Sequence, residues 1–261
     1  MKYQILLLLL VTIISLTCLI ASFAENEQSL ALYLPFDEGK GDVAKDASGN
    51  GNDGTINGKA KWVEGKYGTA LEFDSKSDYV EIPFNDILNI TKDITLEVWV
   101  KPTKDYIDEP NAWYYFIFKR GYIWELGWQG WGDSITLKLV PAGQAAVSTD
   151  FKMSLNKDEW YHIAGVKKGS FLGIYVNGEK RSSIDSFPGD IASQNTPITV
   201  NFAHQDAEHT GFAGVFDEIA IFSQALTEEE IQKTMKGILK PHVVEPSGKL
   251  TTVWGQMKQD E

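Results

Sequence analysis

The feature that most constrains the fold of this sequence is a succession of short runs in which apolar and polar residues alternate. A period of two is the pattern of a β-strand that buries one face, and these runs are rich in Val, Ile, Thr and aromatic residues. Gly, Asn, Asp or Pro separates one run from the next. The predicted strands are 30–36, 69–73, 78–83, 94–100, 134–140, 161–167, 171–177, 197–203 and 214–222. This pattern predicts an all-β fold, an antiparallel β-sandwich of the jelly-roll type.

Two local signals add detail to this fold. Asn177-Gly178 supplies the positive φ angles of a type I′ hairpin turn. One short C-terminal helix is predicted: Thr227 is its N-cap, Glu230 completes a capping box and Gly237 ends it. We expect this helix to pack on the sandwich.

The N-terminal segment 1–24 has the layout of a secretory signal peptide, with one Lys, an apolar run and small residues before Ala24. Cleavage after Ala24 predicts a secreted or cell-surface protein, and the alternative is an N-terminal membrane anchor. The only cysteine, Cys18, lies in this segment, so the exported chain would fold without disulfides. We expect one domain over 25–238, followed by a polar C-terminal arm over 239–261.

The charge of the chain narrows the classes of partner that it can bind. The formal net charge of -12 argues against nucleic acid, because affinity for phosphates comes from Lys and Arg. An acidic surface suits solubility and also cation binding.

The loop "DASGNGNDG", residues 46–54, places oxygen-bearing side chains close together among glycines. Calcium takes six to eight oxygen ligands, and Asp46, Asn50 and Asp53 with freed carbonyls are candidates for part of such a shell. The alternative is a series of Asx-turns, in which these side chains accept hydrogen bonds from the backbone. The sequence leaves both interpretations open.

Five longer segments carry a resemblance to a known family: "LYLPFDEGKGDVAKDASGNGNDGTI", "GKYGTALEFDSKSDYVEI", "ITLEVWVKP", "EWYHIAGVKKGSFLGIYVNGE" and "FAGVFDEIAIFSQALTEEEI". In this order they resemble the landmarks of a laminin G-like domain of the bacterial type, in the concanavalin A-like lectin/glucanase superfamily. The resemblance runs from about residue 30 to residue 235. It implies two curved antiparallel sheets face to face and a protein that binds carbohydrates or proteins, often with calcium, and seldom catalyses a reaction.

The resemblance also implies candidate binding residues. It places the loop 46–54 where the first and last strands meet, which would bring Asp217 to the calcium ligands. Gln205 and Asp206 match two ligand-type residues of the related pentraxins. Lys119-Arg120 departs from the pentraxin pattern, and we expect Arg120 to face Asp206 in a salt-bridged rim or to receive an acidic sugar.

An enzyme of this fold would need paired carboxylates. The glucanase branch carries them as Glu-x-Asp-x-x-Glu on one strand face, and the sequence lacks that motif. Glu97 and Glu125 stand alone, and Asp217-Glu218 point to opposite faces of a strand. The sequence therefore predicts no catalytic residues, and a glycoside hydrolase is the weakest of the functions considered.

The tryptophans favour a binding function. Of eight, Trp128 and Trp131 fall in a Gly-rich segment predicted to be an exposed turn, where a rigid ring can stack on a sugar. The alternative is that they cap the sandwich edge, whereas Trp99, Trp160 and Tyr175 are expected in the core. We predict an exported, non-catalytic module for a glycan or a surface protein. The alternative is an adhesion domain that binds protein through a sheet edge or the C-terminal arm.

Overall fold

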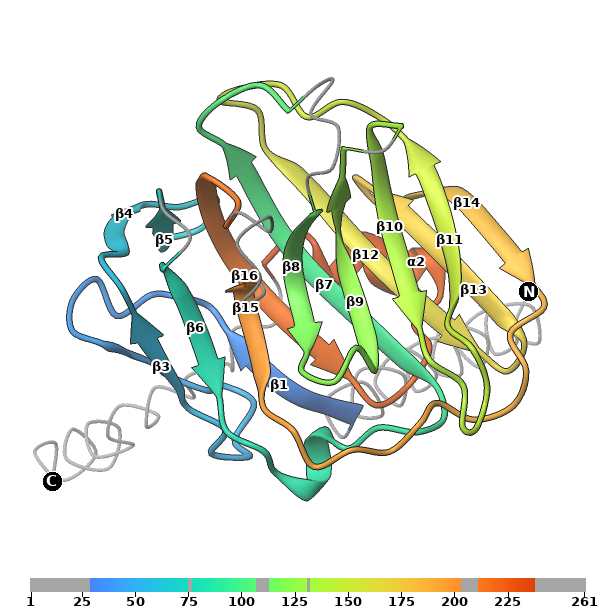
Figure 1. Ribbon diagram of the computed structural model, residues 1–261. Helices are drawn as coiled ribbons and strands as arrows, with labels where there is room; N and C mark the ends of the chain where they lie inside the picture. Colours follow the sequence, from blue (N-terminus) through green and yellow to red (C-terminus); the bar gives the residue numbers. More distant parts are fainter. Residues whose placement is uncertain (1–28, 75–76, 107–112, 131, 203–210, 238–261) are drawn as a thin grey trace, which may run out of the picture.

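The computed structural model describes residues 29–74, 77–106, 113–130, 132–202 and 211–237. Its strands form two antiparallel sheets that pack face to face, as Figure 1 shows. This arrangement confirms the predicted β-sandwich. The predicted leader and the predicted C-terminal arm from residue 239 lie outside the described residues.

The first sheet has eight strands and forms the rear layer in Figure 1. Seven are hydrogen bonded in the order β14, β13, β12, β7, β16, β5, β4, and β1 also pairs with β16. Their bounds are β14 Glu179–Asp185, β13 Phe171–Val176, β12 Tyr161–Lys168, β7 Ile94–Pro102, β16 Gly214–Phe222, β5 Thr69–Phe73, β4 Lys61–Glu64 and β1 Leu30–Leu34.

The second sheet also has eight strands, in the order β11, β10, β9, β8, β15, β6, β3, β2. Their bounds are β11 Val147–Lys152, β10 Ser134–Leu139, β9 Trp124–Gln129, β8 Trp113–Lys119, β15 Ile198–Phe202, β6 Tyr79–Ile82, β3 Gly54–Asn57 and β2 Val43–Ala44. A 3-10 helix, η1 Asp86–Leu88, and one α-helix, α2 Glu228–Thr234, complete the described elements.

The first and last strands of the domain are neighbours. β1 pairs with β16 in antiparallel register, with Leu32 opposite Ile221 and Leu34 opposite Ile219. The expectation that the first and last strands meet is confirmed. Because this pairing joins the two ends of the domain, contacts that hold β1 also hold the sandwich closed.

Strand alternation builds the core between the sheets. On β9, Trp124, Leu126 and Trp128 belong to the main apolar cluster. The residues between them, Glu125 and Gly127, therefore face away from the sandwich interior. The face of the second sheet that is turned away from the core is called its outer face below.

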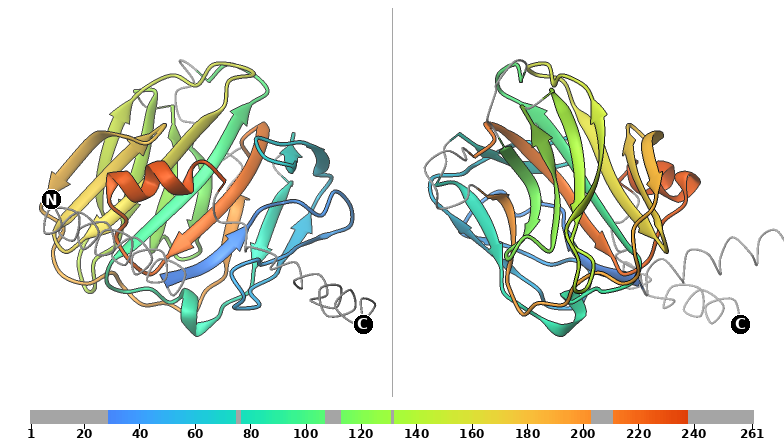
Figure 2. Two further views of the ribbon diagram at one scale, coloured as in Figure 1. Left: turned by 180° about the vertical axis from the view of Figure 1, so that it is seen from behind. Right: turned by 45° about the vertical axis from the view of Figure 1, so that its right-hand side comes forward.

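Helix α2 covers the face of the first sheet that is turned away from the second sheet (Figure 2). The capping box of Thr227 and Glu230 is confirmed, and Ile231 packs in a second apolar cluster with Tyr175 and Phe222. The predicted docking of the C-terminal helix is thus confirmed, and the Asn177-Gly178 turn has the predicted positive φ angles of 53° and 78°.

Two buried titratable residues lie under α2. Glu97 is 2% exposed and accepts a hydrogen bond from the Thr234 hydroxyl at 3.0 Å, and its other oxygen lies 3.9 Å from Nε2 of His162. Burial raises the pKa of Glu97 to about 8 and lowers the pKa of His162 to about 3. At neutral pH the contact therefore joins two largely uncharged groups, not an ion pair.

Two of the three predicted core aromatics are buried, Trp99 at 4% and Tyr175 at 6% exposure. Trp160 is only half-buried, so its assignment to the core is wrong. It precedes β12 and packs edge-on against Trp99, with ring centres 6.3 Å apart. None of the described helices is long and apolar enough to cross a membrane.

Candidate functional site

The loop 46–54 is organised by the carboxylate of Asp46. One oxygen accepts hydrogen bonds from the backbone N–H groups of Tyr33 and Ser48, and the other accepts one from Asn52, at 2.8–3.0 Å. Asn50 donates its amide to the carbonyl of Leu30 at 2.8 Å. The loop therefore ties β1 down through side-chain to backbone bonds of the Asx-turn kind.

Two further predicted cation ligands have protein partners of their own. Asp53 accepts the N–H of Asp46 at 2.9 Å and pairs with the Lys45 ammonium at 2.6 Å. Asp217 accepts the N–H groups of Lys66 and Tyr67 at 2.8 and 3.0 Å, so its carboxylate holds a different turn. Burial raises the pKa of Asp217 to about 8.

These contacts fit the Asx-turn interpretation better than a calcium centre. The Asp46 oxygens are occupied by three N–H donors, and a lysine ammonium competes for Asp53. Within the described ranges, no group of three or more His, Cys, Asp or Glu side chains is arranged to hold a metal ion. Calcium binding by this loop stays a prediction, and its thermal test is given with Asp46 in the Discussion.

The predicted basic pair Lys119-Arg120 does not form one surface. Lys119 is 1% exposed, and its ammonium donates to the carbonyls of Leu88 and Thr196 inside the sandwich. The Arg120 guanidinium lies 2.8 Å from a carboxylate oxygen of Glu81. Gln205 and Asp206 lie outside the described residues, so their contact with Arg120 stays a prediction.

Trp128 is not in an exposed turn. It lies on β9 at 1% exposure, and its indole N–H donates to the carbonyl of Met153 at 3.0 Å. Its ring packs against Tyr106 and Tyr114, with centres 5.5 and 5.9 Å away. The sequence pattern was misread because "WELGWQ" continues one strand in which every second residue turns inward. Trp131 lies outside the described residues.

We expect the change Trp128→Ala to destabilise the fold by about 3–5 kcal/mol, the usual cost of emptying a large aromatic site in a core. Trp128→Phe keeps a ring in place and should cost clearly less. Urea unfolding followed by circular dichroism measures both. Equal stability of Trp128→Ala and the wild type would contradict the buried position.

The outer face of the second sheet carries three rows of side chains that cross β8, β9, β10 and β11. The strand registers define the rows as Trp113, Gln129, Ser134, Lys152; then Tyr115, Gly127, Thr136, Asp150; then Phe118, Glu125, Lys138, Ser148. Aromatic residues thus lie along β8, and polar residues lie along the next three strands. Gly127 occupies the middle of this surface and leaves a hollow where other rows have a side chain.

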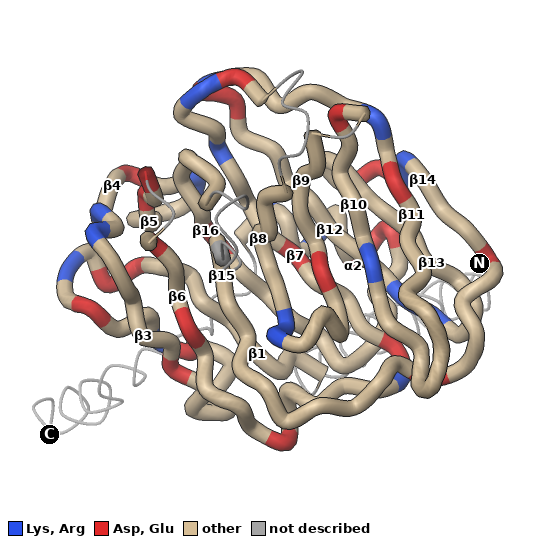
Figure 3. The backbone as a smooth tube through the Cα atoms, viewed as in Figure 1, with Lys and Arg blue, Asp and Glu red and all other residues tan. Residues whose placement is uncertain are grey.

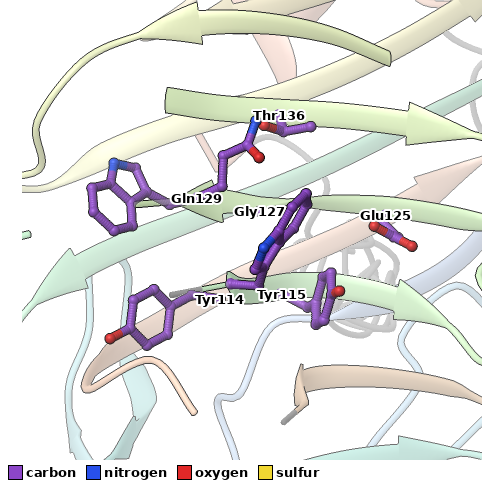
Figure 4. Close-up of a pocket in the computed structure, with 8 residues that line it drawn as sticks. Tyr114, Tyr115, Glu125, Gly127, Gln129 and Thr136 are labelled. Carbon is purple, nitrogen blue, oxygen red and sulfur yellow. The ribbon is translucent and has the colours of Figure 1, made fainter. Parts of the chain in front are cut away.

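A pocket lies at this hollow. Its lining residues are Trp113, Tyr114, Tyr115, Glu125, Gly127, Trp128, Gln129 and Thr136, and Figure 4 shows Tyr115, Glu125, Gln129 and Thr136 around Gly127. A Cβ atom added at Gly127 would collide with the carbonyl oxygen of Tyr114, so this position requires glycine. The close approach of β8 and β9 therefore fixes the floor of the pocket.

A partly buried ion pair lies at the edge of the pocket. Both carboxylate oxygens of Glu125 lie 3.0 Å from the Lys138 ammonium, and the Glu125 side chain is 3% exposed. Figure 3 shows the acidic and the basic position side by side on β9 and β10. Burial raises the pKa of Glu125, and the ammonium of Lys138 opposes this rise. Lys138 thus favours the ionised carboxylate at the edge of the pocket.

The Lys138 ammonium also lies between two aromatic rings. Its distance is 5.7 Å to the ring centre of Trp113 and 5.6 Å to that of Tyr122. Trp113 is half-buried, and Tyr122 is 39% exposed. The site therefore combines accessible aromatic surface with a carboxylate, an amide and hydroxyl groups, the mixture that orients polar ligands in protein pockets.

Sequence reasoning did not assign this pocket to binding. In "WYYF", residues 113–116, Trp113 and Tyr115 lie on the outer face, whereas Tyr114 packs inward. Glu125 was noted only as an isolated carboxylate. The alternation in "WELGWQ" contains the signal, because it sends Glu125, Gly127 and Gln129 to one face.

The chain belongs to the concanavalin A-like lectin/glucanases superfamily, whose laminin G-type family model matches residues 74–232. This match confirms the family resemblance of the sequence. No relative with a curated description matches the sequence.

Solved structures share the fold. Domain 4 of AbnA, an extracellular arabinanase from Geobacillus stearothermophilus solved in complex with arabinotriose, is 21% identical, with a TM-score of 0.63 over 82% of this chain and 98% of that domain. The binding domain of Paraclostridial Mosquitocidal Protein 1 is 17% identical, with a TM-score of 0.66 over 81% of this chain and 53% of that one. The binding domain of Botulinum neurotoxin DC, solved with rat synaptotagmin II, is 14% identical, with a TM-score of 0.64 over 82% of this chain and 52% of that one. The chain thus spans about half the length of these toxin domains.

Proposed function

We propose that this protein is an exported, non-catalytic module that binds glycans in the pocket on the outer face of the second sheet. The observation that carries the proposal is the composition of this pocket. A ring on one strand, Trp113, stands beside the carboxylate of Glu125 and the amide of Gln129 around a glycine floor. A sugar has apolar ring faces and hydroxyl edges. The Trp113 ring matches the apolar faces, and the carboxylate and amide match the hydroxyl groups.

Two comparisons support this proposal. The superfamily takes its name from lectins as well as glucanases, and the domain of AbnA was solved with an arabinose oligosaccharide. The toxin binding domains extend the same fold to receptor recognition, since one was solved with a protein receptor. Secretion is proposed together with this function, because the N-terminal segment has the layout of a signal peptide.

The chemistry of the pocket favours binding over hydrolysis. Glycoside hydrolysis uses two carboxyl groups placed on either side of the scissile bond. Glu125 is the one carboxylate among the residues that line the pocket, and both its oxygens contact Lys138. A single carboxylate that is already engaged by an ammonium supports a binding role for the pocket, because hydrolysis would need a second carboxyl group across the bond.

The proposal is tested by screening residues 25–261 on a glycan array and measuring the best oligosaccharide by calorimetry. We expect Trp113→Ala to weaken binding by about 30-fold, since a well-placed aromatic anchor is worth about 2 kcal/mol. Trp160→Ala is the matched control, because it removes a half-buried indole that packs on Trp99 of the first sheet. The control should bind like the wild type.

Three results would contradict the proposal. One is glycan binding that survives Trp113→Ala in a protein that remains folded. The second is release of reducing ends from the bound polysaccharide. The third is a glycan array on which the protein binds no sugar, together with tight binding of a surface protein. That result would favour the adhesion-domain alternative.

A further inference from the structure

The charges around the pocket point to the class of glycan that it accepts. Glu125 lies beside Gly127 along β9, and Asp150 lies two strands away in the row of Gly127. We propose that the pocket selects neutral glycans and discriminates against glycans that carry carboxylate groups. This inference rests on the proposed glycan-binding function.

Two of the hydrogen-bond donors beside Gly127 are already directed to a carboxylate. The Thr136 hydroxyl donates to Asp150 at 2.7 Å, and the Gln129 amide donates to the same oxygen of Asp150 at 2.8 Å. The side chains of Gln129, Thr136 and Asp150 therefore offer mainly hydrogen-bond acceptors to an incoming sugar. Hydroxyl groups donate to such acceptors, whereas a carboxylate has no proton to give.

Two cations near the pocket are already paired with carboxylates. Lys138 contacts both oxygens of Glu125 from the facing strand, and Arg120, at the end of β8, is paired with Glu81 of β6. Lys152 stands opposite Ser134, two strands away from Gln129. Lys104 lies over the rings of Tyr106 and Tyr114, and both rings belong to the main apolar cluster and not to the outer face.

An acidic sugar would meet repulsion at two distances. Over the hollow, its carboxylate would approach Glu125 and Asp150, and like charges opposed at an interface are strongly unfavourable. At longer range, the net charge of -12 repels a polyanionic chain. A neutral sugar encounters neither penalty and keeps the stacking surface of Trp113.

Matched oligosaccharides test this inference. Cellohexaose and mannohexaose are each compared by calorimetry with the same sugar after oxidation of its primary hydroxyls to carboxylates. We expect at least one neutral member to bind and its oxidised form to bind about 10-fold more weakly or worse. Asp150→Asn and Glu125→Gln should each reduce this difference in affinity. The exposed control Glu64→Gln on β4 should leave it unchanged.

The outcomes separate this inference from the function on which it rests. An oxidised sugar that binds as tightly as its neutral form, and whose binding disappears in Trp113→Ala, would overturn the selectivity while leaving glycan binding intact. A difference in affinity between neutral and oxidised sugars that neither Asp150→Asn nor Glu125→Gln reduces would also overturn the selectivity. If no member of either series binds, the selectivity and the proposed function fail together.

Discussion

The change Asp46→Ala is expected to lower the free energy of unfolding by about 3–5 kcal/mol, because it leaves three backbone N–H groups without their acceptor. Two of these donors belong to the buried residues Tyr33 and Asn52. Tyr33 lies on β1, which pairs with the last strand of the domain. Urea unfolding with and without calcium measures the loss. Asp46→Asn is the control, since it keeps one oxygen for Tyr33 and Ser48 and should lose clearly less.

The same experiment decides between the turn and the cation interpretations of the loop. Calcium at about 100 times its Kd would stabilise the wild type by about 2.7 kcal/mol. For a domain of this size, the melting temperature would rise by about 5–10 °C. This shift should disappear in Asp46→Ala if the loop binds calcium. Equal melting of the wild type in calcium and in chelator would contradict calcium binding. If Asp46→Ala has the same free energy of unfolding as the wild type, the turn interpretation is contradicted as well.

The change Glu97→Gln is expected to stabilise the protein at alkaline pH. The folded-state pKa of Glu97, about 8, lies above the ordinary value of 4.5. A raised folded-state pKa gives stability that is fully present below the unfolded pKa and is lost as pH rises through the folded pKa. The glutamine side chain of the variant has no charge to bury, so its advantage should grow between about pH 4.5 and pH 8. At pH 9 we expect this advantage to reach about 5 kcal/mol.

Melting curves of both proteins from pH 4 to pH 9 measure this effect. The neighbouring His162 is unchanged in the variant, so the difference between the two curves isolates Glu97. Glu228→Gln, which neutralises an exposed carboxylate on α2, is the control and should show no such growth. Parallel melting curves for Glu97→Gln and the wild type across this range would contradict an uncharged Glu97 under the helix.

The sequence was sufficient to predict the sandwich because period-two alternation and turn residues act locally. The β1–β16 pairing needed the family resemblance as well, since the two strands are far apart in sequence. The capping box at Thr227 was predictable from four residues. By contrast, β11, "VSTDFK", mixes exposed and buried positions without a clear apolar face, and it was not predicted as a strand.

The candidate site was much less accessible to sequence reasoning. Glu125 and Lys138 are thirteen positions apart, and only the β9–β10 register places them face to face. The inward or outward direction of Trp113 and Tyr114 depends on the strand to which they belong, because a shift of one residue exchanges the faces. The prediction that Trp128 is exposed failed for another reason, because the Gly-rich segment that predicts a turn is part of strand β9. Exposure of an aromatic residue is a tertiary property, and composition near glycines does not fix it.

The most direct test of glycan recognition by this protein is a crystal structure with the neutral oligosaccharide that binds best. We expect one sugar ring to lie over Gly127, with a face in contact with Trp113 and hydroxyls within hydrogen-bond distance of Glu125 and Asp150. A sugar seated on the first sheet, or at the loop 46–54, with an empty pocket at Gly127 would contradict this account.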